Sequence, residues 1–238
     1  VFDEKRYFSS GTESFIFNCQ NTKIGVLICE DQWVSKPIKA LCQSGVDLII
    51  SLNASPFQLN KQSERINICK SYALEFSVTF VYVNMVGGQD EVVFDGNSFV
   101  VNDNGEVSLQ LPAFEEICSL HNVLQSRSNL LSDEATIYSA IVLATRDYIK
   151  KNSFEGALIG LSGGIDSALT LAIAVDAIGA DNVHAVMMPY EYTSEISLTD
   201  SELQAQSQSV EYSNIDIHSM VDSFNSSLSD LFENTEID

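Results

Sequence analysis

The sequence Ala157-Leu158-Ile159-Gly160-Leu161-Ser162-Gly163-Gly164-Ile165-Asp166-Ser167 joins an apolar, strand-like run to a helical stretch that extends from Ala168 to Ile178. A glycine-rich turn at the start of a helix predicts a phosphate-binding loop, because free backbone N–H groups and the positive end of the helix dipole converge there. The hydroxyls of Ser162 and Ser167 add two polar groups at the same place.

Asp166 gives this loop a second property. No lysine follows the glycines, so the loop is not the type in which a lysine reaches the β- and γ-phosphates. A carboxylate beside a bound phosphate is repelled unless a cation lies between them, so Asp166 is a candidate ligand for Mg²⁺. A bare Ser-Gly-Gly sequence is equally compatible with an ordinary turn capped by Ser or Asp. The whole hexapeptide between a strand and a helix favours the phosphate site.

The composition restricts the class of protein. The 238 residues are 45% hydrophobic, which is enough for one large or two modest cores. The formal net charge of -21 opposes nonspecific binding to nucleic acid. The sequence shows no apolar run of membrane-spanning length and no signal-peptide pattern, so we expect a cytoplasmic protein without a membrane partner.

The cysteines and histidines predict no metal centre. The 5 cysteines are an odd number without C-x-x-C spacing, which indicates reduced thiols and not a disulfide framework or a zinc site. The 3 histidines are scattered along the chain, which favours surface or core positions over ligand positions.

The chain divides near Leu131. Before this residue, strand-like and helical stretches alternate, and the segment Phe99 to Leu111 predicts a hairpin with its turn at Asn102-Asp103-Asn104-Gly105. We expect one domain over residues 1–119, a linker over 120–133 and a second domain over 134–238. The second domain begins with a helix capped by Ser132-Asp133-Glu134, and its predicted apolar face carries Ile137, Ile141, Ala144 and Tyr148.

Cys29 is the informative residue of the first half. It ends the β-rich run Lys23 to Ile28 and precedes the polar residues Glu30-Asp31-Gln32, and a strand end is where a fold presents a nucleophile to substrate. A lone cysteine is more often a small buried apolar residue. The sequence around Cys29 favours the catalytic interpretation.

The phosphate loop resembles the signature of the ATP pyrophosphatase family, and the stretch from Tyr148 to Ser197 is similar to NAD synthetase. The residues that carry this similarity are Phe154-Glu155-Gly156, the run from Gly160 to Ala168, Met187-Met188-Pro189, Tyr192-Thr193-Ser194 and Ser197. The resemblance implies that ATP is bound by Gly160, Leu161, Ser162, Gly163, Gly164, Ile165, Asp166, Ser167 and Met188, with Mg²⁺ on Asp166 and adenine near Met188.

The first half resembles the glutaminase domain of glutamine-dependent NAD synthetases, a member of the nitrilase, or carbon-nitrogen hydrolase, superfamily. The similarity lies in three runs: Gly25 to Trp33, Asn53 to Phe57 with Lys61 and Arg65, and Val83-Asn84 with Gly87 to Gly96. It implies that Cys29 is the nucleophile and Glu4 the supporting glutamate, while the base glutamate and catalytic lysine precede Val1. It also implies that Ser55 and Lys61 bind glutamine, although Lys61 could instead be a solvated lysine opening a helix.

Together the resemblances imply an α/β fold: a partial nitrilase-like α-β-β-α sandwich followed by a partial Rossmann-like parallel α/β nucleotide-binding domain. They imply a homo-oligomeric ligase in which ammonia from glutamine and ATP convert nicotinic acid adenine dinucleotide to NAD, releasing AMP and pyrophosphate. Two alternatives remain open. Another ATP-pyrophosphatase amidotransferase would share the loop but not the context of Cys29 and Gly87-Gly88-Gln89-Asp90, and an incomplete pair of sites would bind ATP without turnover.

Overall fold

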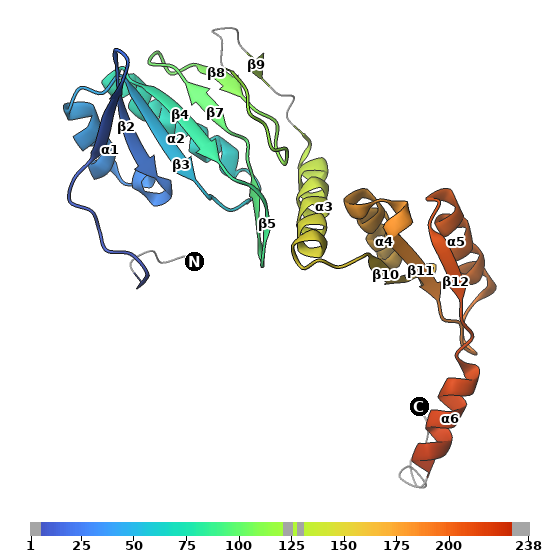
Figure 1. Ribbon diagram of the computed structural model, residues 1–238. Helices are drawn as coiled ribbons and strands as arrows, with labels where there is room; N and C mark the ends of the chain where they lie inside the picture. Colours follow the sequence, from blue (N-terminus) through green and yellow to red (C-terminus); the bar gives the residue numbers. More distant parts are fainter. Residues whose placement is uncertain (1–5, 121–125, 128–130, 230–238) are drawn as a thin grey trace. The chain divides into compact units, whose positions relative to one another are not determined.

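The computed structural model describes residues 6–120, 126–127 and 131–229 (Figure 1). These residues form two compact units, Val1–Ala140 and Ile141–Asp238. The division falls inside the long helix α3 (Asp133–Lys151), whereas the sequence places the second domain at the start of that helix. The domain boundaries inferred from the sequence stay a prediction.

The first unit is built on a sheet that contains seven strands among its described residues, in the order β1-β2-β3-β4-β7-β8-β9, with β5 and β6 paired separately as a hairpin. The strands are β1 Phe15–Cys19, β2 Thr22–Ile28, β3 Leu48–Asn53, β4 Thr79–Asn84, β5 Val86–Gln89, β6 Val92–Asp95, β7 Phe99–Val101, β8 Val107–Gln110 and β9 Ser126–Arg127. A 3-10 helix (Cys29–Trp33) and α1 (Ser35–Gln43) connect β2 to β3, and α2 (Lys61–Phe76) connects β3 to β4.

The three central strands β2, β3 and β4 are parallel, and their register brings their carboxyl ends to one edge of the sheet. Ile28 pairs with Leu52, and Leu52 pairs with Val83. The polar residues that come next therefore lie at the same edge, because parallel strands with matched ends stop together. Cys29 follows Ile28 there, beside Asn53 and Asn84 at the ends of the neighbouring strands.

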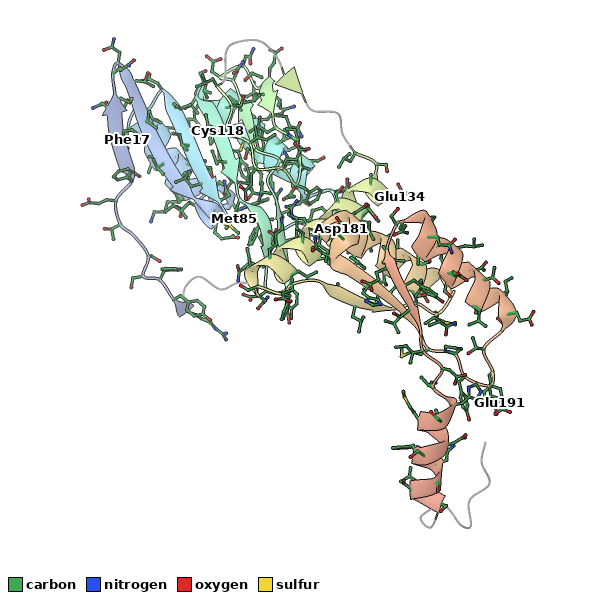
Figure 2. All side chains as sticks on the ribbon, turned by 45° about the vertical axis from the view of Figure 1, so that its right-hand side comes forward. Phe17, Met85, Cys118, Glu134, Asp181 and Glu191 are labelled. Carbon is green, nitrogen blue, oxygen red and sulfur yellow. The ribbon has the colours of Figure 1, made fainter. Side chains whose placement is uncertain are left out.

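One face of this sheet carries the core. Alternate residues of the parallel strands, such as Leu27, Ile49 and Phe80, are buried in a single cluster with Ile38 and Leu41 of α1 and with side chains of α2. The opposite face also carries apolar side chains, including Ile50 and Val81, but these are only half-buried. Phe17, on the edge strand β1, is exposed (Figure 2). A sheet with helices on one face is one half of the predicted α-β-β-α sandwich.

The second unit has a parallel sheet. Its described strands are β10 (Ala157–Gly160), β11 (Val183–Met187) and β12 (Glu211–Asn214), and they lie in that order. Its helices are α4 (Ile165–Ile178), α5 (Glu195–Ser207) and α6 (His218–Leu228), with a short 3-10 turn at Ala180–Asn182. Leu171 and Ala174 of α4 and Ala205 of α5 share a core with the strand residues Val183 and Ala185. The alternation of parallel strands and helices confirms the predicted Rossmann-like class.

Two local predictions are confirmed by hydrogen bonds. In the hairpin turn the N–H of Gly105 donates to the carbonyl of Asn102 at 2.8 Å, with Gly105 at a φ of +78°. At the start of α3 the hydroxyl of Ser132 accepts from the N–H of Ala135 at 3.2 Å.

The apolar face expected on α3 from the sequence is not the face that is buried. Ala140 and Leu143 are the buried positions, while Ile137 is 43% and Tyr148 60% exposed. The helix carries apolar residues on two adjoining stripes, and periodicity alone does not say which stripe packs. None of the described helices has the length and the apolar content that crossing a membrane requires.

Candidate active site

The glycine-rich loop has the strand-turn-helix geometry expected of a phosphate site. It leaves β10 at Gly160, and Gly164 caps α4 with an extended backbone (φ −89°, ψ 159°). The hydroxyl oxygens of Ser162 and Ser167 lie 3.0 Å apart, and the N–H of Ser162 donates to the Ser167 hydroxyl at 3.2 Å. Two hydroxyls thus lie together beside the N-terminus of α4, which is an arrangement suited to an anion.

Gly163 is fixed at its position by a neighbour that sequence reasoning did not connect with it. Its φ is +78°, and a Cβ added to it would lie 2.5 Å from the carbonyl oxygen of Ser197 and 2.7 Å from its Cα. Ser197 lies in the first turn of α5, which Ser194 caps by accepting from the Ser197 N–H. The start of α5 therefore rests directly on the loop, with glycine as the spacer.

Asp166 and Met188 lie at the edges of this loop. Asp166 is exposed in the first turn of α4. Met188 follows β11 and is 53% exposed, and its Cε would be 3.8 Å from a Cβ added to Gly160. The connection between β11 and α5 comes after Met188, and Glu191 in this connection is labelled in Figure 2. Loop and connection lie at the carboxyl end of the parallel strands, where open α/β sheets bind ligands.

The donors at the loop fit Mg²⁺ only together with phosphate. Among the described residues, no group of three or more His, Cys, Asp or Glu side chains could hold a metal ion. Mg²⁺ commonly takes one or two carboxylates and completes its octahedron with substrate phosphates and water. The single carboxylate of Asp166 beside the Ser162–Ser167 loop is compatible with that mode.

Cys29 occupies a strained turn at the end of β2. It is half-buried, begins the 3-10 helix Cys29–Trp33 and has a φ of +44°, a left-handed conformation that is uncommon for a residue with a side chain. The turn is closed by Asp31, whose carboxylate accepts from the N–H of Ile28 at 2.9 Å. Backbone strain of this kind costs about 1–3 kcal/mol and is concentrated at functional sites.

A series of buried hydrogen bonds connects this turn to the neighbouring strands. The hydroxyl of Ser51 on β3 donates to Gln32 at 2.8 Å, and the amide of Asn53 donates to the carbonyls of Ser51 at 2.9 Å and Val83 at 3.1 Å. Gln32 is 1% exposed. The position of the Cys29 turn is therefore tied to β3 and β4. The sequence contained Gln32 as a polar residue after an apolar strand, but nothing local showed that it points inward.

The structure brings Lys61 to the same turn. Its ammonium lies 4.1 Å from the centroid of the Trp33 ring and 2.8 Å from a carboxylate oxygen of Glu64. The contact with the ring is a cation–π interaction, which holds the lysine on the Cys29 side of α2. Ser55 is buried in the loop after β3. Glu4 lies outside the described residues.

Burial raises the pKa of two side chains in the core of the first unit, Tyr82 and Cys69. It raises the pKa of Tyr82 to about 12, an effect that Arg65 and Ser55 partly oppose and to which the charges of Cys29 and Cys69 add smaller contributions. It also raises the pKa of the Cys69 thiol to about 12. Both side chains therefore stay neutral at physiological pH. None of the five cysteines forms a disulfide.

Comparison with known families accounts for both halves of this arrangement. Residues 1–128 match the carbon-nitrogen hydrolase family, and residues 137–237 match the NAD synthase family. The chain belongs to the carbon-nitrogen hydrolase family, and the NAD synthase match covers its second part.

The relatives carry both parts in one chain. The glutamine-dependent NAD(+) synthetase of Acinetobacter baylyi is 46% identical over 246 residues, which cover 100% of this chain and 46% of the relative. That of Synechocystis is 37% identical over 253 residues, covering 98% of this chain and 45% of the relative. The chain thus spans about half the length of the curated relatives it matches.

Solved structures agree over the same extent. The structure of a glutamine-dependent NAD+ synthetase from Acinetobacter baumannii in complex with ADP matches with a TM-score of 0.93 and 47% identity, covering 100% of this chain and 47% of that one. A glutamine-dependent NAD(+) synthetase from Cytophaga hutchinsonii matches with a TM-score of 0.80 at 16% identity, covering 97% of this chain and 47% of that one, which shows the shared fold.

Proposed function

We propose that the full-length protein is a glutamine-dependent NAD synthetase. It would hydrolyse glutamine at the Cys29 site and use the ammonia to amidate nicotinic acid adenine dinucleotide at the Ser162–Ser167 loop. The observation that carries the proposal is that one chain holds both a strained cysteine at the edge of a nitrilase-like sheet and a hydroxyl-rich phosphate loop in a parallel sheet. Both family matches and the names of the relatives support it.

At the first site, the thiolate of Cys29 would attack the side-chain carbonyl carbon of glutamine. The C–N bond breaks, the nitrogen takes up a proton and leaves as ammonia, and water then hydrolyses the thioester to glutamate. Lys61, held against Trp33, would attract the α-carboxylate, and Ser55 would donate a hydrogen bond to the substrate. Glu4 would take the supporting role that the family resemblance gives it.

At the second site, the loop would hold the phosphates of ATP. The hydroxyls of Ser162 and Ser167 lie 3.0 Å apart, and together with the free N–H groups at the start of α4 they would bind the pyrophosphate that leaves. Asp166 would hold Mg²⁺, which when bound neutralises charge on the phosphates. Met188, exposed after β11, would contact the adenine ring. Ammonia would then displace AMP from the adenylated carboxylate and give NAD.

The cell compartment and the oligomeric state also belong to this proposal. Five thiols without a disulfide fit a reducing compartment, so we infer a cytoplasmic enzyme. We further infer a homo-oligomer from the family resemblance. Light scattering of the purified full-length protein measures its mass in solution, and a monomeric mass would contradict the oligomer.

The experiment that tests the function is a product analysis with the full-length protein. Nicotinic acid adenine dinucleotide, ATP and Mg²⁺ are supplied with either ammonium or glutamine labelled with ¹⁵N in its side-chain amide. We expect AMP, pyrophosphate and NAD with both nitrogen donors, and ¹⁵N in the NAD amide from labelled glutamine. Release of ADP in place of AMP would contradict the proposed adenylation. Turnover of a different carboxylate substrate would identify another amidotransferase.

A further inference from the structure

Arg65 is a fully buried arginine whose side chain contacts the loop that carries Ser55. Its exposed fraction is 0%. One terminal nitrogen, Nη2, donates to the carbonyl of Ser55 at 3.0 Å, the hydroxyl of Ser55 at 3.1 Å and the carbonyl of Pro56 at 3.1 Å. The planar guanidinium can direct several N–H groups to fixed points, which a lysine ammonium on a flexible stem cannot reproduce.

Asp95, at the end of β6, balances the charge of this arginine. The other terminal nitrogen of Arg65, Nη1, lies 2.9 Å from both carboxylate oxygens. The side-chain amides of Asn84 and Asn97 also donate to Asp95, at 3.3 and 3.1 Å. With Asp95 itself 3% exposed, its carboxylate is satisfied by four donated hydrogen bonds inside the protein.

Ser55 is held at each of its three polar atoms by these residues. Its N–H donates to the side-chain oxygen of Asn84 at 2.9 Å, while its carbonyl and its hydroxyl oxygen both accept from Arg65. The Asn84 amide also donates to that carbonyl at 3.4 Å. Such a set of bonds fixes both the backbone and the rotamer of Ser55.

The chemistry of the guanidinium sets the direction of the Ser55 hydroxyl. A guanidinium only donates hydrogen bonds, so the Ser55 oxygen must be the acceptor in their contact. The hydroxyl hydrogen is then directed away from Arg65. The Tyr82 phenol lies beside this hydroxyl inside the protein, and a substrate acceptor that enters would take over the Ser55 hydrogen.

The network lies at the same sheet edge as Cys29. Asn84 ends β4, Ser55 follows β3 closely, and Cys29 follows β2, and the register aligns the ends of these three strands. Phe57 is also fixed here, because its N–H donates to the carbonyl of Val93 on β6 at 2.7 Å. The loop beside the nucleophile is thus anchored to α2, β4 and the β5–β6 hairpin.

We propose that Arg65, together with Asp95 and Asn84, is a positioning residue for glutamine: it holds the Ser55 hydroxyl as an oriented donor beside Cys29. The inference rests on the proposed glutaminase function. Replacing a buried ion pair by apolar residues is often neutral for stability, so stability alone does not account for this one. A pair of apolar side chains in the same place could not orient the Ser55 hydroxyl towards a substrate.

The test uses the full-length protein and compares kinetics with the two nitrogen donors. We expect Arg65→Lys and Asn84→Ala to raise the KM for glutamine roughly 10- to 100-fold, as the loss of hydrogen bonds to a charged or buried group does. We expect kcat at saturating glutamine to change by only a few-fold, and ammonium-driven synthesis to be unchanged. Arg65→Met should raise the KM further than Arg65→Lys, because lysine restores part of the hydrogen bonding.

A matched control lies on the same helix. Glu75 of α2 contacts Lys39 at 4.0 Å with both side chains about half exposed, and Glu75→Gln should leave both activities unchanged. An unaltered KM for glutamine in Arg65→Lys and Asn84→Ala would overturn the inference. An equal loss with both donors would also overturn it, because the network would then maintain the fold and not the substrate loop. A wild-type protein that uses ammonium but not glutamine would instead contradict the proposed function.

Discussion

Gly163 and Ser197 approach so closely that no side chain fits between them: a Cβ on Gly163 would lie 2.5 Å from the carbonyl oxygen of Ser197. The two residues belong to different elements, the loop before α4 and the first turn of α5. Their contact sets the distance between the glycine-rich loop and the connection that follows β11. The geometry of the proposed ATP site therefore depends on a glycine that is required by packing as well as by its positive φ.

We expect Gly163→Ala to abolish ATP-dependent synthesis with either nitrogen donor, because the added methyl group must displace either the loop or the start of α5. Gly179→Ala is the matched control at the other end of α4. Gly179 also has a positive φ, of +84°, but a Cβ there would meet nothing within 4 Å. It should lower the free energy of unfolding by about 1–3 kcal/mol and leave the KM for ATP unchanged. A normal KM for ATP in Gly163→Ala would show that the loop tolerates the displacement.

Cys29→Ala should separate the two activities. Without the thiolate no thioester forms, so glutamine-driven synthesis should fall by at least about a thousandfold while ammonium-driven synthesis continues. Glutamate release and NAD formation are measured in parallel in the full-length protein. Cys19→Ala, at an exposed thiol on β1, is the control and should change neither rate. Equal losses with both donors in Cys29→Ala would mean that Cys29 is structural.

Asp166→Asn should reduce Mg²⁺-dependent adenylation by about a hundredfold or more, because it removes a metal ligand while conserving the size of the side chain. Glutamate release at Cys29 should persist. The measurement is AMP formation as a function of Mg²⁺ concentration. Asp181→Asn, in the exposed turn beyond α4, is the control and should leave the Mg²⁺ dependence unaltered. If Asp166→Asn behaves like this control, the loop is an ordinary turn.

Alkaline pH should destabilise the first unit through Cys69 and Tyr82. Burial raises the pKa of both to about 12, from 9.0 for the thiol and 10.0 for the phenol. Their neutral forms stabilise the fold fully below the unfolded pKa values, and this contribution is lost as the pH rises towards 12. Each group should lower the free energy of unfolding by about 1.4 kcal/mol per pH unit once its unfolded form ionises.

Denaturant unfolding of the full-length protein at pH 8, 9.5 and 11 checks this slope. Cys69→Ala should be less stable at pH 8, because it leaves a small cavity, but its stability should fall less steeply with pH. A slope that is unchanged in Cys69→Ala would exclude the buried thiol as a cause. The predicted loss begins above pH 9, so stability between pH 7 and 8 should be constant with respect to these two groups.

Much of this architecture could be predicted from short stretches of sequence. The strand before Ser162, the glycines and the helix after Asp166 lie within about twenty residues of one another, and their conformations depend on local bonding and periodicity. The end of β2 at Cys29 and the turn at Gly105 are of the same kind. Periodicity does not say which apolar stripe of α3 is buried, because its stripes differ only in what they pack against.

The contacts that connect residues far apart in the chain were decided by the tertiary structure alone. Arg65 meets Asp95 across 30 positions, and Ser55 meets Asn84 across 29. These residues lie in or near the sequence motifs, but the motifs did not predict that they contact one another. Their meeting requires the parallel register of β3 and β4 and the return of the β5–β6 hairpin. Local sequence thus determined which polar groups stand at each turn. Strand order and register determined which of these groups share a site, because strand order and register depend on burying one face of the whole sheet.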